Sequence, residues 1–203
     1  MLKMLKNKPL ETQRVYQERT AHYLSYLPLP KTILEYPIIQ DTVLGIFEFA
    51  PTEGRPFWTH LTSGMSETAQ MTSSGNSVFI EIIFYSVENS TWVDRFLTNL
   101  ASYPFENKEC FSPRDTLPME RSLYEGSKLT SLLLLEPLLE NPEISPMFIQ
   151  HKQVDILWAL PITEMERQFM ITNGNEVADQ WINKCVTLNN LPKLLDFNRD
   201  SLL

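Results

Sequence analysis

The sequence predicts an α+β fold: a single domain in which a mixed or antiparallel central sheet is flanked by helices. Its predicted elements are segregated along the chain instead of alternating, in the order one helix, several strands, a second helix, further strands and two helices. The chain has 203 residues, of which 43% are hydrophobic and 21% charged, as is typical of one globular domain. Because no internal repeat or low-complexity linker divides it, we expect residues 1–203 to form one domain.

Residues 12–27 are expected to form the first helix, because their large side chains recur on one helical face until Pro28 and Pro30 end the pattern. Three strands are predicted next. Residues 33–36 and 41–49 are short, β-branched and aromatic, and residues 57–62 alternate large with polar side chains after a turn.

Residues 63–76 are rich in serine, threonine and glycine and surround Met65 and Met71. This composition predicts a mobile loop that exposes both methionines. Residues 77–85 follow as the strongest strand of the sequence, apolar on both faces except at Glu81. Such a pattern is typical of a central strand covered on both sides.

The second half of the chain is predicted to add two strands and three helices. Residues 92–104 carry apolar side chains at helical spacing until Pro104, where we expect the helix to stop. Residues 128–135 and 153–160 read as strands, the latter ending at Pro161. Thr163 and Glu166 have the spacing of a capping box, and the Asn173-Gly174-Asn175 sequence is expected to break that helix before a second short one at residues 176–185.

The charge balance argues against nucleic acid as a partner. Seventeen basic and 25 acidic residues give a net charge of −8, whereas binding to phosphate backbones requires a basic face. No apolar stretch is long enough to span a membrane. Residues 1–6 are cationic, but the apolar segment and cleavage site of a secretory signal do not follow them. We therefore expect a cytoplasmic protein that contacts neither nucleic acid nor membrane.

Motifs for catalysis, cofactors or metals are missing from the sequence. His22, His60 and His151 are too dispersed for a local metal motif, and His60 is expected to be a core or sheet-surface residue. The six glycines are isolated, so no phosphate-binding loop is expected. Cys110 and Cys185 are 75 residues apart and are predicted to be reduced structural thiols. We predict no catalytic residue, no cofactor and no metal.

Three segments resemble the suppressor of fused-like family, over about residues 32–185. Residues 58–67, which read WTHLTSGMSE, resemble a segment of that family and are followed by the strand around Glu81. The helix from Trp92 to the sequence LASYP resembles another. Residues 154–166, which read VDILWALPITEME, resemble the family's strand, its Pro-Ile-Thr sequence and its acidic helix start.

This resemblance implies a non-enzymatic protein-binding domain. Bacterial single-domain relatives are thought to act as immunity proteins that neutralise polymorphic toxins, so we expect a protein partner such as a basic toxin domain. One alternative is a small-molecule-binding or catalytic α+β domain whose site assembles from scattered carboxylates and His60. A further alternative is a structural subunit of a larger assembly.

Four residues are candidates for contact with a partner: Met65, Glu67, Met71 and Glu164. Three of them lie in the polar loop of residues 63–76, where two methionines could adapt to a partner surface. Glu164 lies at the predicted acidic helix start. The sequence does not identify the partner or the oligomeric state.

Overall fold

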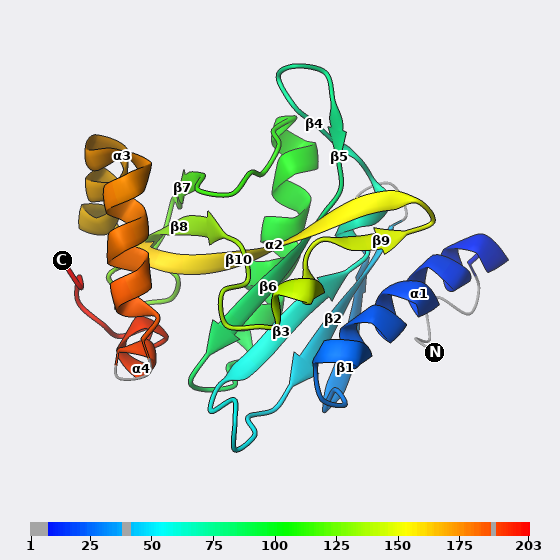
Figure 1. The fold of residues 1–203 in the computed structure, drawn as a ribbon, viewed down its shortest axis with the longest axis horizontal. Helices are drawn as coiled ribbons and strands as arrows, with labels where there is room; N and C mark the ends of the chain where they lie inside the picture. The colour runs from blue at the N-terminus through cyan, green and yellow to red at the C-terminus, as the bar shows by residue number, and fades with distance from the viewer. Residues whose placement is uncertain (1–7, 38–41, 188–189) are drawn as a thin grey trace.

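A mixed sheet of eight strands is the centre of the structure (Figure 1). The computed structural model describes residues 8–37, 42–187 and 190–203; the expectations for residues 1–6 and Asp41 lie outside these ranges. The main path of the sheet runs β1-β2-β3-β6-β10-β8-β7, and β9 pairs with β10. β6 and β10 are parallel and the other pairs antiparallel, so the predicted mixed sheet is confirmed. The strands are β1 (Thr32–Pro37), β2 (Val43–Phe49), β3 (Trp58–Ser63), β6 (Ile80–Ser86), β7 (Thr116–Pro118), β8 (Leu129–Leu135), β9 (Met147–Ile149) and β10 (Lys152–Thr163).

Helices cover both faces of this sheet. α1 (Leu10–Tyr26) and α3 (Glu164–Cys185) pack into one hydrophobic cluster, and α2 (Trp92–Asn107) packs into the other. α1 contacts β3 and β9, whereas α3 contacts β8 and β10, so these two helices lie at opposite ends of their shared face (Figure 1). The short α4 (Leu191–Leu194) follows α3. Among the described residues, no helix has the length and apolar character needed to cross a bilayer.

The start and the interruption of α3 are as the sequence predicts. Thr163 Oγ1 accepts a hydrogen bond from the Glu166 amide at 3.2 Å, and the Glu166 carboxylate accepts from the Thr163 amide at 2.7 Å, which completes the capping box. Gly174 has non-helical torsions, φ 76° and ψ 173°, and kinks the helix. Its φ is positive, but its ψ lies far from the left-handed helical region.

Two prolines do not stop their elements as predicted. α2 runs past Pro104 to Asn107, and the proline is buried within the helix although it cannot donate a helical hydrogen bond. β10 likewise continues through Pro161 to Thr163. β6 pairs with β10 only at residues 155–158, so Pro161 lies beyond that ladder, where its carbonyl accepts from Arg199 Nη2 at 3.0 Å.

The segment at residues 63–76 is more ordered than a plain loop. It contains a 3₁₀ turn, Met65–Glu67, and the strand β4 (Gln70–Met71), which pairs with β5 (Ser77–Val78) in a separate two-stranded sheet. The strand predicted at residues 77–85 is therefore divided, and its central part begins at Ile80 in β6. Every residue of β6 is buried, Glu81 included, which confirms that this strand is covered on both faces.

Candidate functional site

A tight turn at Gly64 follows β3 and sets the position of the next three residues. Gly64 has φ 134°, a torsion that side chains with a Cβ rarely adopt, and a Cβ there would lie 2.3 Å from the Val43 carbonyl oxygen. Glycine is therefore required at this position. The turn directs Met65 into the core, where it is fully buried, and directs Glu67 towards the surface.

Glu81 holds this turn from beneath. Its Oε1 accepts hydrogen bonds from the Gly64 amide at 2.9 Å and from the Ser66 amide and hydroxyl at 3.1 and 2.6 Å. Its Oε2 accepts from Thr62 Oγ1 at 2.7 Å. A buried carboxylate that accepts several hydrogen bonds is well compensated for its lost hydration. The charged residue of the central strand thus has a structural task.

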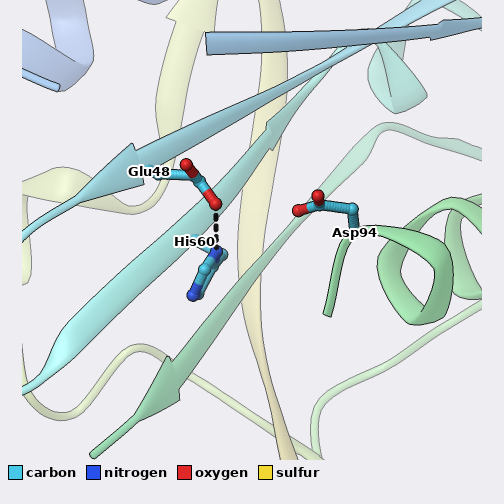
Figure 2. Close-up of side chains that lie close together, drawn as sticks. All are labelled: Glu48, His60 and Asp94. Carbon is cyan, nitrogen blue, oxygen red and sulfur yellow. Dashed lines mark ion pairs between the residues drawn. The ribbon is translucent and has the colours of Figure 1, made fainter. Parts of the chain in front are cut away.

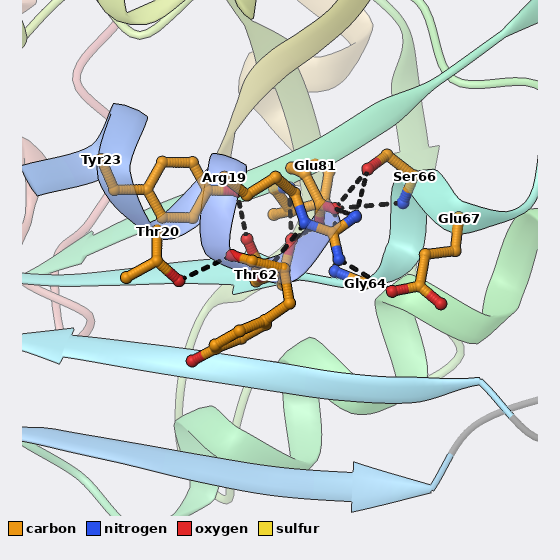
Figure 3. Close-up of polar contacts among 11 residues, drawn as sticks. Arg19, Thr20, Tyr23, Thr62, Gly64, Ser66, Glu67 and Glu81 are labelled. Carbon is orange, nitrogen blue, oxygen red and sulfur yellow. Dashed lines mark hydrogen bonds and ion pairs between the residues drawn. The ribbon is translucent and has the colours of Figure 1, made fainter. Parts of the chain in front are cut away.

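Arg19 of α1 completes the network (Figure 3). Its guanidinium donates to Ser63 Oγ and Ser66 Oγ, both at 3.1 Å, and to Glu67 Oε1 at 2.8 Å. It also lies 3.6 Å from Glu81 Oε1, and neither side chain of this pair is more than 1% exposed. Burial opposes the charge, but Glu81 and Glu67 outweigh it and raise the pKa of Arg19. The network fastens α1 to the turn and fixes the direction of Glu67.

A groove of about 350 Å³ opens above this network. α1 forms one wall through Val15 and Arg19, and the β9–β10 hairpin forms another through Ile149 and Val154. Glu67 lines the groove between them. The lining is mixed, because Glu11, Gln150 and Lys152 also border the groove. The groove therefore combines apolar and polar side chains with a carboxylate whose position is fixed by a buried arginine.

The structure separates the four residues predicted to contact a partner. Glu67 lines the groove, and Met71 is 53% exposed four residues later on β4. Met65 is fully buried, so the expectation that it is exposed is wrong: the Gly64 turn directs its side chain inward. Glu164 starts α3, at the end of the sheet away from α1, and is held by Arg167 at 2.8 Å. Glu67 and Met71 thus belong to one continuous segment that excludes Glu164.

A second polar cluster lies on the α2 face of the sheet (Figure 2). Glu48 of β2 and His60 of β3 are directly opposite each other in the antiparallel ladder, and Asp94 of α2 points towards them. The three residues offer one ligand atom each within 4.8 Å of one another. Burial lowers the pKa of His60 to about 4, so its ring is neutral at pH 7. Burial also raises the pKa of both carboxyls, and for Glu48 the nearby Asp94 adds to this effect.

The sequence did not reveal this second cluster, because its members are not spaced as a local motif. Once β2 and β3 are assigned, their hairpin register alone would place Glu48 opposite His60. Asp94 joins them only because α2 packs on this face, which is a tertiary contact. The expectation that His60 is a core histidine is confirmed by its complete burial.

Both cysteines are free thiols, as predicted. Burial raises the pKa of Cys185 to about 11 and also raises the pKa of Cys110. A thiol that stays protonated at neutral pH is a poor nucleophile. Neither cysteine therefore adds chemistry to the two polar clusters.

Comparison with known proteins identifies the family. The family model described as Suppressor of fused protein (SUFU) matches residues 40–200, which is most of the chain. The chain belongs to the suppressor of fused family. This is a family of protein-interaction domains, and the match confirms the resemblance seen in the sequence. No curated protein matches this chain closely enough in sequence to be counted as a relative.

Solved structures of the same fold extend the comparison. A suppressor of fused homolog from Neisseria gonorrhoeae superposes with a TM-score of 0.68 and 20% identity, over 95% of this chain and 97% of that one. A chain of the Sufu-Fu complex gives 0.67 and 14% identity, with 95% and 91% covered. Drosophila Suppressor of Fused gives 0.65 and 16% identity, with 95% of this chain but only 51% of that one covered. These likenesses show a shared fold.

Proposed function

We propose that this chain is an immunity-type protein that binds and neutralises a basic protein toxin in the cytoplasm of a bacterial cell, without catalysing a reaction. The observation that carries the proposal is the groove beside α1. There Glu67 is fixed by Arg19, and the same segment presents the exposed Met71. A rigid acidic side chain and an exposed, adaptable apolar one on the same segment suit the recognition of a basic protein surface.

The charge of the chain supports a basic partner. A net charge of −8 attracts such a partner over distances of about a Debye length and speeds encounter, mainly at low salt. Apolar contacts in the groove would then set the rate of dissociation. In this proposal, the acidic exterior determines the rate of association and the groove determines the rate of dissociation.

The relatives support a protein partner of some kind. One structure of the same fold is titled the Sufu-Fu complex, and that protein is therefore seen together with a protein partner. This chain covers nearly all of the Neisseria homolog but about half of the Drosophila protein. It corresponds in extent to the shorter relative.

Co-expression with the protein encoded by the adjacent gene tests this proposal. We expect a stable complex and rescue of cell growth when that protein is toxic. Glu67→Lys and Met71→Ala should each weaken binding about tenfold or more, measured by biolayer interferometry. Each variant removes a side chain through which residues 67–71 would contact the partner. Glu164→Lys is the matched control, with the same charge change on the far end of the sheet, and should leave dissociation unchanged. Absence of both complex and rescue would overturn the proposal.

A further inference from the structure

The cluster of Glu48, His60 and Asp94 has the composition and spacing of a metal site. Three elements, β2, β3 and α2, contribute one side chain each, and Figure 2 shows the carboxylates of Glu48 and Asp94 turned towards each other beside the imidazole. His60 Nδ1 lies 3.8 Å from Glu48 Oε1. Around a tetrahedral ion with bonds of about 2.0–2.2 Å, ligand atoms lie about 3.3–3.6 Å apart. The pair at 3.8 Å is close to this spacing, and pairs at the observed limit of 4.8 Å would have to close by about 1 Å.

The imidazole of His60 has no hydrogen-bond partner within the described parts of the chain. Its side chain is 0% exposed, and both ring nitrogens are buried without a donor or acceptor in contact. The 3.8 Å distance to Glu48 is too long for a hydrogen bond, and a neutral ring forms no ion pair. Buried polar groups in proteins are usually paired, and the unpaired ring of His60 lies beside two carboxylates.

The groups around the cluster also favour a cation. Two carboxylates lie close together in a largely buried place, where the Lys31 cation and a hydrogen bond with Thr32 partly offset the effect of burial on Glu48. Tyr36 Oη donates to Asp94 Oδ2 at 3.1 Å, which orients this carboxylate and leaves Oδ1 free. Hydrogen bonds of this kind from outside the coordination sphere commonly orient metal-binding carboxylates.

We propose that Glu48, His60 and Asp94 bind a divalent first-row transition-metal cation, with Zn²⁺ as the expected ion. One imidazole nitrogen and two carboxylate oxygens are ligands that Zn²⁺ accepts in proteins. Three protein ligands leave a fourth position for water or another group, on the side of Asp94, which is the more exposed of the three. The ion would tie the first turn of α2 to the β2–β3 hairpin.

Titration of the full chain with zinc chloride, after removal of metal by a chelator, tests the site. Isothermal calorimetry should show one equivalent of Zn²⁺ bound. His60→Gln and Asp94→Asn should each weaken the affinity at least tenfold, as expected when a ligand is lost. His151→Gln changes a histidine of the β9–β10 turn, away from the cluster, and should bind like the wild type. Circular dichroism checks that each variant is folded.

Cobalt provides a readout that does not depend on the variants. Co²⁺ bound by the wild-type protein should give ligand-field absorption of low-symmetry nitrogen and oxygen coordination, and Zn²⁺ should abolish it by competition. The proposal is overturned if the wild type binds no equivalent of either ion. It is equally overturned if folded His60→Gln binds Zn²⁺ as tightly as the wild type, because the ion would then be held elsewhere.

Discussion

The two faces of the sheet each bury a polar cluster, and the two clusters differ in how completely their groups are paired. On the α1 face, each nitrogen of the Arg19 guanidinium and each oxygen of the Glu81 carboxylate has a hydrogen-bond partner. On the α2 face, His60 is just as buried, yet neither ring nitrogen has a partner in the described residues. Burial alone therefore does not distinguish a structural cluster from a binding site. The state of pairing separates these two clusters, because an unpaired buried group costs folding energy that a ligand can recover.

The largest effect is expected from breaking the paired cluster. Glu81→Leu leaves the Arg19 charge buried and the Gly64 and Ser66 amides without their acceptor. The free energy of unfolding should fall by about 3–5 kcal/mol, as measured by urea denaturation. Adding Arg19→Met to Glu81→Leu should restore part of this loss, because no unpaired charge then remains. A loss below about 1 kcal/mol for the single variant would mean that the network is not structural.

The turn above the network should be nearly as sensitive. Gly64→Ala places a Cβ 2.3 Å from the Val43 carbonyl oxygen, at a φ of 134°. We expect a loss of about 2–3 kcal/mol in the same unfolding measurement. Gly54→Ala is the control, because a Cβ there meets nothing within 4 Å and φ is not positive, and it should be close to neutral. Equal losses for the two variants would contradict the role of the turn.

The smallest effect is expected at the unpaired cluster when metal is absent. His60→Leu removes a buried ring whose nitrogens make no hydrogen bond and leaves an apolar side chain in contact with the core. In the presence of a chelator, the free energy of unfolding should change by less than about 1 kcal/mol. A loss comparable to that of Glu81→Leu would show that His60 has strong partners after all, and the contrast between the two faces would disappear.

The sequence predicted what depends on local pattern and missed what depends on packing. The longer strands of the sheet, the capping box of Thr163 and Glu166 and the interruption at Gly174 follow from residues close together in the chain. The short strands β4, β7 and β9 were not predicted. Pro161 was wrongly expected to end β10, because its tolerance depends on where β6 stops pairing.

The polar cluster on the α1 face also could not be predicted in full from the sequence, because it depends on packing. Glu81 stood out as the polar residue of an apolar strand, but its partner Arg19 lies 62 positions earlier on α1. Met65 was expected at the surface because composition describes a loop without giving the direction of a side chain. The torsion of Gly64 decides that direction.

The dependence of stability on zinc tests the contrast between the two faces most directly. Urea unfolding of the wild type and of His60→Leu would be measured side by side across a series of Zn²⁺ concentrations. A folded state that binds Zn²⁺ through His60 should gain about 2.7 kcal/mol when the free ion reaches a hundred times its dissociation constant, whereas His60→Leu should gain nothing. Equal responses of the two proteins, whether both flat or both rising, would contradict the account.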